Sequence, residues 1–157
     1  MFGMDTMSEA VKPLRDVPEF TSILTRFSNP ILGMLAGLIL TAVIQSSSAS
    51  VGILQALCVT GAVSYSAAIP IIMGQNIGTC VTAMLSSVGA NKNAKRAAVI
   101  HLYFNVIGTV IFMIVYYTVT SLVDIPMLEG EVTETGVAIV HTAFNVFATA
   151  LLLPFNK

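Results

Sequence analysis

The sequence lacks tryptophan, has only 2 cysteines and carries little charge. Only 10% of its 157 residues are Asp, Glu, Lys or Arg, whereas 55% are hydrophobic and the mean hydropathy is +0.87. Soluble domains carry about 25% charged residues, so this chain has too few of them to coat a surface in water. The composition predicts an integral membrane protein with helical spans. The formal net charge of −1 argues against nucleic acid as a partner.

The scarce residue types constrain other features of the protein. Without tryptophan, the membrane-interface anchors would have to be Tyr103, Tyr116 and Tyr117. Cys58 and Cys80 lie in apolar stretches without metal-ligand spacing, which predicts small buried hydrophobic residues. The N-terminus has no signal-peptide pattern and resembles the end of a helix, so we expect the chain to be part of a longer protein.

The first thirty residues mix charged and apolar side chains at roughly helical spacing. Pro13 and Pro18 interrupt this pattern. Residues 1–30 are therefore predicted to form short helices at the membrane interface.

Two short apolar runs flank a polar stretch, Gln45 to Ser48. The runs span residues 31–44 and 51–63, whereas a complete membrane span needs about 20 residues. Residues 31–63 are therefore predicted to form a re-entrant hairpin with the Q-S-S-S sequence at its tip, near the bilayer midplane. One continuous span broken at its centre is the alternative. Gly33 and Gly37 form a G-x-x-x-G pair that would let another helix approach closely.

A second interrupted segment covers residues 64–90. It contains Pro70 and the sequence GQNIGT, in which Gly74 and Gly78 can release the backbone from helical geometry. Irregular backbone at membrane depth must be buried in protein or line a cavity. The segment predicts a broken transmembrane helix.

Residues 91–157 are predicted to hold two full transmembrane helices, over 97–120 and 136–155. A basic turn at 89–97 precedes them, and the loop between them is acidic. Basic loops stay on the cytoplasmic side, which places the 89–97 turn inside. The whole chain is thus expected to be a single all-α membrane domain. The charged residues that set this orientation are Lys92, Lys95, Arg96, Asp124, Glu129, Glu131 and Glu134.

A short motif occurs twice, 40 residues apart. The sequences HLYFNVIGT (101–109) and HTAFNVFAT (141–149) share His, Phe, Asn, Val and Thr. His and Asn are four residues apart and therefore on one helical face. Hydrogen bonding between helices is one interpretation, and ion coordination or proton sensitivity through His101 or Asn105 is the other.

The two polar breaks offer ligand groups without fixed charge. Amide and hydroxyl groups at Gln45 to Ser48 and in GQNIGT both donate and accept hydrogen bonds. Helix N-termini after each break, near Ala49 and Cys80, would attract an oxyanion, and the carbonyl and hydroxyl oxygens suit Na⁺. Paired breaks at the midplane are typical of secondary transporters. Neither histidine has an acidic partner placed by sequence, so we expect no enzyme.

The sequence TAVIQSSSAS, followed by MGQNIGTCVTA, resembles the type II sodium-dependent phosphate cotransporters, including bacterial members. FGMDTMSEAVKPL and NKNAKRAAVIHLYFNVIGT are also similar to segments of that family. The resemblance implies two inverted repeats, each with a Q-S-S-S hairpin and a G-x-N-I-G-T break, of which this chain looks like the second. It also implies symport of inorganic phosphate with Na⁺ as the coupling ion, in the cell membrane (the inner membrane of a bacterium), without a cofactor or transition metal.

The resemblance also implies two sets of site residues. The chain departs from many relatives at Gln75, where a small residue is common, and at Cys80, where Thr is common. The expected phosphate-binding residues are Gln45, Ser46, Ser47, Ser48 and Ser50. The expected cation-binding residues are Gln75, Asn76, Gly78, Thr79, Thr82 and Asn105.

Only one Q-S-S-S sequence is present, whereas the resemblance implies a site built from two repeats. The expected partner is a matching first repeat, in the same longer chain or in a second copy. Two alternatives remain at this point. One is an orphan-repeat membrane scaffold or interaction subunit without transport activity, and the other is a channel.

Overall fold

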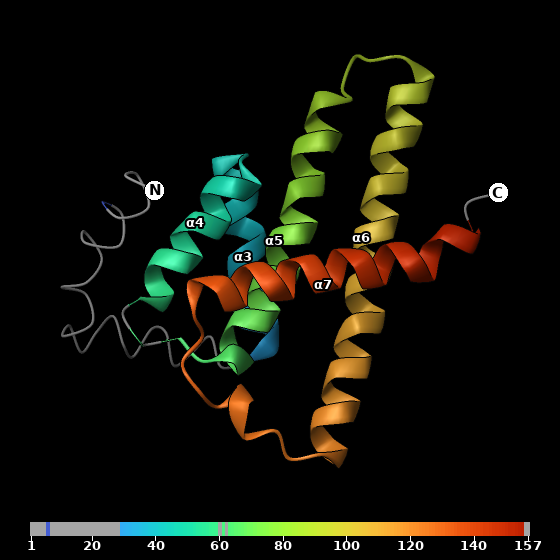
Figure 1. Ribbon diagram of the computed structural model, residues 1–157. Helices are drawn as coiled ribbons and strands as arrows, with labels where there is room; N and C mark the ends of the chain where they lie inside the picture. The colour runs from blue at the N-terminus through green and yellow to red at the C-terminus, as the bar shows by residue number, and fades with distance from the viewer. Residues whose placement is uncertain (1–5, 7–28, 60, 62, 156–157) are drawn as a thin grey trace.

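The computed structural model describes residues 6, 29–59, 61 and 63–155. Nearly all of the predicted interfacial region, 1–30, lies outside these residues. The described part is all-helical apart from one isolated bridge between Ser64 and Glu131. Its helices (Figure 1) are α3 Pro30–Ile44, α4 Ser47–Cys58, α5 Tyr65–Ser86, α6 Lys92–Leu122 and α7 Glu134–Leu152, with 3-10 turns η2 Pro126–Leu128 and η3 Leu153–Phe155.

Helices α5, α6 and α7 are each long and apolar enough to cross a membrane. Helices α3 and α4, with 15 and 12 residues, are shorter, as predicted for the segment 31–63. Figure 1 shows α7 crossing over α5 and α6 rather than running alongside them. Helix α7 therefore contacts several helices in turn, including α4 at its N-terminal end.

A polar side chain caps the start of each helix in the described part, accepting a hydrogen bond from a backbone N–H of the first turn. The position at which each of these helices begins is therefore set by its capping residue. One predicted boundary was wrong: α6 begins at Lys92 because Asn91 caps it, so Lys95 and Arg96 lie in the helix and not in a turn. The capping residues are Asn29, Ser46, Ser64, Asn91 and Thr133.

The chain reverses direction between α3 and α4 (Figure 1), through the two residues Gln45 and Ser46. Gln45 ends α3 in the left-handed conformation, with φ 56°, and its N–H donates to Thr41 O at 2.8 Å. The interruption thus falls at the polar stretch, where it was predicted. Its depth in a bilayer stays a prediction.

Helix α5 differs from the prediction of a broken helix. It runs without interruption from Tyr65 to Ser86, through Pro70 and the GQNIGT sequence. Polar side chains reinforce the turn that they occupy, since Asn76 Nδ2 donates to Ile72 O and Thr79 Oγ1 donates to Gln75 O, both at 3.0 Å. The prediction was wrong because Gly74 and Gly78 allow another helix to pack closely against α5 and do not interrupt α5 itself.

Those glycines bring α3 and α5 into backbone contact. A Cβ atom at Gly74 would overlap the carbonyl oxygen of Met34, and one at Gly78 would lie 2.7 Å from Leu38 O. From the other side, a Cβ at Gly37 would overlap Ile71 O. The close approach predicted for Gly37 is therefore confirmed, with α5 as the neighbour.

The core of the described bundle lies among α4, α5 and α7, and side chains of α6 pack against it. Phe144 of α7 is fully buried, and its ring meets that of Phe112 edge-on, with 5.5 Å between centroids. Next to them, a Cβ at Gly108 would lie 3.0 Å from Ala148 Cβ, so the two helices are close here as well. This packing holds α7 in one orientation against the rest of the bundle. That orientation determines which α7 residues face α4.

Candidate functional site

The Q-S-S-S stretch forms the end of α3 and the start of α4. Ser46 caps α4, with its Oγ accepting from Ala49 N at 3.3 Å and lying 3.3 Å from Ser48 Oγ. The first backbone N–H to bond within the helix is that of Ser50, which donates to Ser46 O at 3.0 Å. The N–H groups of Ser47 and Ser48 precede it and have no helical acceptor. The first turn of α4 therefore offers free donors and the positive end of a helix dipole.

A groove of about 290 Å³ lies between the first turn of α4 and the face of α7 opposite it. Two of the predicted phosphate-binding residues, Ser47 and Ser48, line it; Gln45 and Ser46 lie just before them in the chain. No Asp, Glu, Lys or Arg is among its lining residues in the described part of the chain. The complete lining is Ser47, Ser48, Val51, Ala138, His141 and Thr142.

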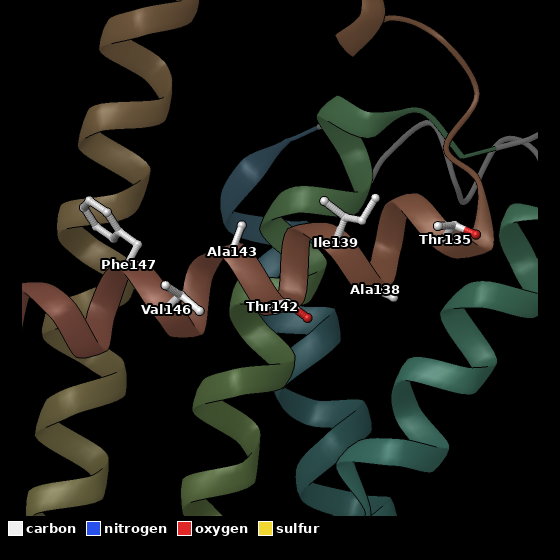
Figure 2. Close-up of a pocket in the computed structure, with 7 residues that line it drawn as sticks. All are labelled: Thr135, Ala138, Ile139, Thr142, Ala143, Val146 and Phe147. Atoms are coloured by element: carbon white, nitrogen blue, oxygen red, sulfur yellow. The ribbon is translucent and has the colours of Figure 1, made fainter.

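The α7 wall of this groove was not predicted from the sequence. Ala138 and Thr142 are four residues apart on α7 and therefore lie on one face of it (Figure 2). They also line a larger, shallow hollow of about 610 Å³ formed by α7 residues alone. The repeated H-x-x-F-N motif was the signal that could have pointed to His141, although it did not show which α7 face meets α4.

The structure places Ser50 away from the groove, in a buried polar cluster with two residues of other helices. Thr41 Oγ1 donates to Ser50 Oγ at 2.7 Å. Gln75 Nε2 donates to both Ser50 O and Ser50 Oγ, each at 3.0 Å. All three side chains are fully buried, so the hydroxyl of Ser50 acts inside the α3–α4–α5 contact. Thr41 was not among the site residues predicted from the sequence.

The side-chain oxygen of Gln75 has no hydrogen-bond partner among the residues that the structure describes. Oε1 is buried, although Nε2 of the same amide is fully used. An unpaired buried carbonyl oxygen is costly in free energy. Such an oxygen is also the ligand type that a hard cation prefers.

The predicted cation-binding residues are divided between two sides of α5. Gln75 contacts α4 through Ser50, and Gly78 packs against α3. On the other side, Cys80 donates to His101 O of α6 at 3.5 Å, and Asn105 Nδ2 donates to the same carbonyl at 3.0 Å. Asn76 and Thr79 bond within α5, and Thr82 is half-buried.

In both copies of the repeated motif, the asparagine side chain forms a hydrogen bond within its own helix. Asn145 Nδ2 donates to His141 O at 2.8 Å, as Asn105 does to His101 O. Each of these two hydrogen bonds therefore lies within a single helix. Among the described residues there is also no group of three or more His, Cys, Asp or Glu that could hold a metal ion.

The sequence matches the family model described as Na⁺/Pi-cotransporter over residues 1–151. The chain belongs to the Na⁺/Pi-cotransporter family. This is a family of transporters and not of enzymes, and together with the three apolar helices it identifies a membrane protein.

Several relatives carry phosphate-related names. The chain is 34% identical over 124 residues to the uncharacterized protein YqeW of Bacillus subtilis, covering 79% of this chain and 39% of that protein. It is 37% identical over 101 residues to human sodium-dependent phosphate transport protein 2B, covering 60% of this chain and 15% of the transporter. It is 25% identical over its whole length to the putative inorganic phosphate export protein YjbB of Salmonella typhimurium, covering 28% of that protein. No solved structure matches the chain.

Proposed function

We propose that this chain supplies the C-terminal repeat of a sodium-coupled inorganic phosphate symporter in the cell membrane. The observation that carries the proposal is the groove at the first turn of α4, where Ser47 and Ser48 lie at a helix N-terminus. Membership of the Na⁺/Pi-cotransporter family supports phosphate as the anion.

Phosphate fits the chemistry of the groove. Its oxygens accept hydrogen bonds, and the first turn of α4 provides serine hydroxyls and unpaired backbone N–H groups on one side. The described residues that line the groove carry no carboxylate that would repel the anion. Gln45, at the end of α3, would add an amide donor at the edge of this turn.

Sodium would lower the cost of bringing that anion into a membrane protein. An unpaired charge in a low-dielectric site is unfavourable, and a nearby cation offsets it. We assign Gln75 Oε1 as one sodium ligand, because it is a buried oxygen without a partner and Gln75 directly contacts α4. The other predicted cation ligands are Asn76, Gly78, Thr79, Thr82 and Asn105.

A matching first repeat would complete the site, from the same longer chain or from a second copy. The sequence has one Q-S-S-S stretch, and the chain spans 39% or less of the relatives described above. With the two hairpin tips facing each other, rocking of one repeat against the other would expose the phosphate alternately to each side.

Uptake of radiolabelled phosphate into proteoliposomes tests this function. The chain alone and a two-repeat version would be reconstituted and compared under an inward Na⁺ gradient and an equal K⁺ gradient. We expect uptake above the K⁺ level from the two-repeat version. Uptake from the chain alone would show that copies of it pair into a working transporter.

Two variants test whether phosphate uptake depends on the groove. Ser48→Ala should reduce uptake strongly, whereas Ser86→Ala, at an exposed position ending α5, should leave it unchanged. No Na⁺-dependent uptake by either version would contradict the proposal and favour a scaffold. Downhill flux that ignores the Na⁺ gradient would favour a channel.

A further inference from the structure

Among the described residues that line the groove, His141 is the one with a titratable side chain. It comes from α7 and faces the first turn of α4, 94 residues away along the chain from Ser47. His101, its counterpart in the other copy of the H-x-x-F-N motif, does not line this groove. The two histidines therefore share a local sequence but differ in what they face.

The imidazole of His141 is not used in the structure. Its backbone carbonyl accepts the hydrogen bond of Asn145, but no hydrogen bond is formed by the ring to any described residue. The side chain is half-buried, so part of the ring stays accessible from the groove and its N–H can donate to a ligand bound there. The packing of α7 holds this donor at the groove.

The two walls of the groove are complementary as oxyanion donors. The α4 wall contributes hydroxyls and N–H groups from Ser47 and Ser48, and the α7 wall contributes His141 and the hydroxyl of Thr142. A tetrahedral oxyanion has acceptor oxygens in several directions, so donors on one wall alone leave some of them unpaired. A hydrogen-bond donor on α7 would also let the bound anion contact a helix other than α3 and α4.

We propose that His141 binds phosphate directly, its imidazole donating an N–H to a phosphate oxygen held at the first turn of α4. The assignment rests on the proposed phosphate site and adds a ligand from α7 to it. His141 is thus a binding residue on α7, and the serine stretch supplies only part of the site within this chain.

Binding of inorganic phosphate to the purified two-repeat version in the presence of Na⁺ tests the assignment, with each substitution made in the repeat described here. His141→Ala should weaken affinity about tenfold or more, as expected for loss of a hydrogen bond to a charged ligand. His141→Asn and His141→Gln place an amide N–H near Nδ1 and Nε2 respectively, and at least one of them should recover much of the affinity. His101→Ala is the matched control and should bind like the wild type.

The outcomes separate the two proposals. No phosphate binding by the wild type would overturn the phosphate site and this assignment with it. Wild-type binding that His141→Ala leaves unchanged would overturn the assignment alone. An equal loss in all His141 variants, with each as thermally stable as the wild type, would also overturn it, because an amide donor would then give no recovery.

Discussion

Gln75 of α5 donates two hydrogen bonds of 3.0 Å to Ser50 of α4, one to its carbonyl oxygen and one to its hydroxyl. Both side chains are fully buried. The contact attaches α5 to the first turns of α4, immediately after the serines that line the groove. A residue expected only to bind a cation is therefore also a structural link between two helices.

Gln75→Leu should destabilise the protein. Leucine keeps a side chain of similar size but removes both donors, so Ser50 O loses its side-chain partner. The free energy of unfolding should fall by about 1–3 kcal/mol, measured by thermal or denaturant unfolding in detergent. Gln55→Leu is the control, because it removes a half-buried hydrogen bond from Nε2 to Glu134 O, of 3.0 Å, and should cost less. Equal losses in the two variants would contradict the importance of burial.

Sodium should stabilise the wild type through Gln75 Oε1. A ligand that binds only the folded state raises the free energy of unfolding by about 2.7 kcal/mol at a concentration one hundred times its Kd. The unfolding temperature should therefore rise when NaCl replaces KCl at constant ionic strength. This increase should be lost in Gln75→Leu and kept in Gln55→Leu. A full increase in Gln75→Leu would remove Gln75 from the cation site.

Gly74→Ala should disrupt the contact between α3 and α5. The new Cβ would overlap the carbonyl oxygen of Met34, and a backbone atom cannot move away as a flexible side chain can. Overpacking of this kind costs about 1–3 kcal/mol, more than the gain in helix propensity from replacing glycine. Ser86→Ala, exposed on the same helix, should change stability little. A neutral Gly74→Ala variant would show that α3 and α5 are not in such close contact.

Local sequence predicted the helical class, the two long helices α6 and α7 and the interruption at Gln45. Each depends on signals within a few residues, namely apolar length and polar caps. The continuity of α5 was not predictable in this way, because a glycine can serve either a break or a close contact. Only the position of α3, which Gly37 and Gly74 bring into contact with α5, decides between them.

The candidate site shows the same limit. Ser47 and Ser48 were found from their unusual polarity between apolar runs. His141 joins them only because Phe144 packs beside Phe112 and thereby orients α7 across the bundle. That crossing depends on long-range packing, which no short motif encodes. Likewise, Ser50 was grouped with its neighbours in sequence, whereas the helical period turns it toward Gln75.

Phe144→Ala should loosen α7. The ring is fully buried against Phe112, and removal of a buried phenyl group typically costs about 3–5 kcal/mol. Val146→Ala, 64% exposed on the same helix, should cost far less. Thermal unfolding in detergent measures both, and similar unfolding temperatures would contradict the described packing.

Thiol labelling should report whether the groove is open to water. Cys58 and Cys80 are only 4% and 0% exposed, so the folded wild type should react slowly with a charged maleimide. Ala138→Cys should react quickly, since Ala138 is exposed at the groove, and phosphate with Na⁺ should slow the reaction. Asn93→Cys, at the exposed start of α6, should react at the same rate with or without phosphate. Equal phosphate effects at both positions would contradict binding at the groove.

Gln45 should show a conflict between stability and binding. It is the one non-glycine residue with positive φ in the described part of the chain, at 56°, a conformation that costs a residue with a Cβ about 1–2 kcal/mol. Gln45→Gly should therefore raise the free energy of unfolding by about 1 kcal/mol after the entropy of glycine is included. Gln45→Ala keeps the unfavourable backbone and should give no such gain.

Both Gln45 variants lose the amide that we assign to phosphate and should bind it more weakly by a similar factor. Measuring unfolding and phosphate affinity on the same preparations separates the two effects. If Gln45→Gly is more stable and binds as tightly as the wild type, the glutamine side chain has no part in the site. If both variants bind weakly and only Gln45→Gly is stabilised, the strained glutamine is kept for its amide, since glycine would make the better helix end.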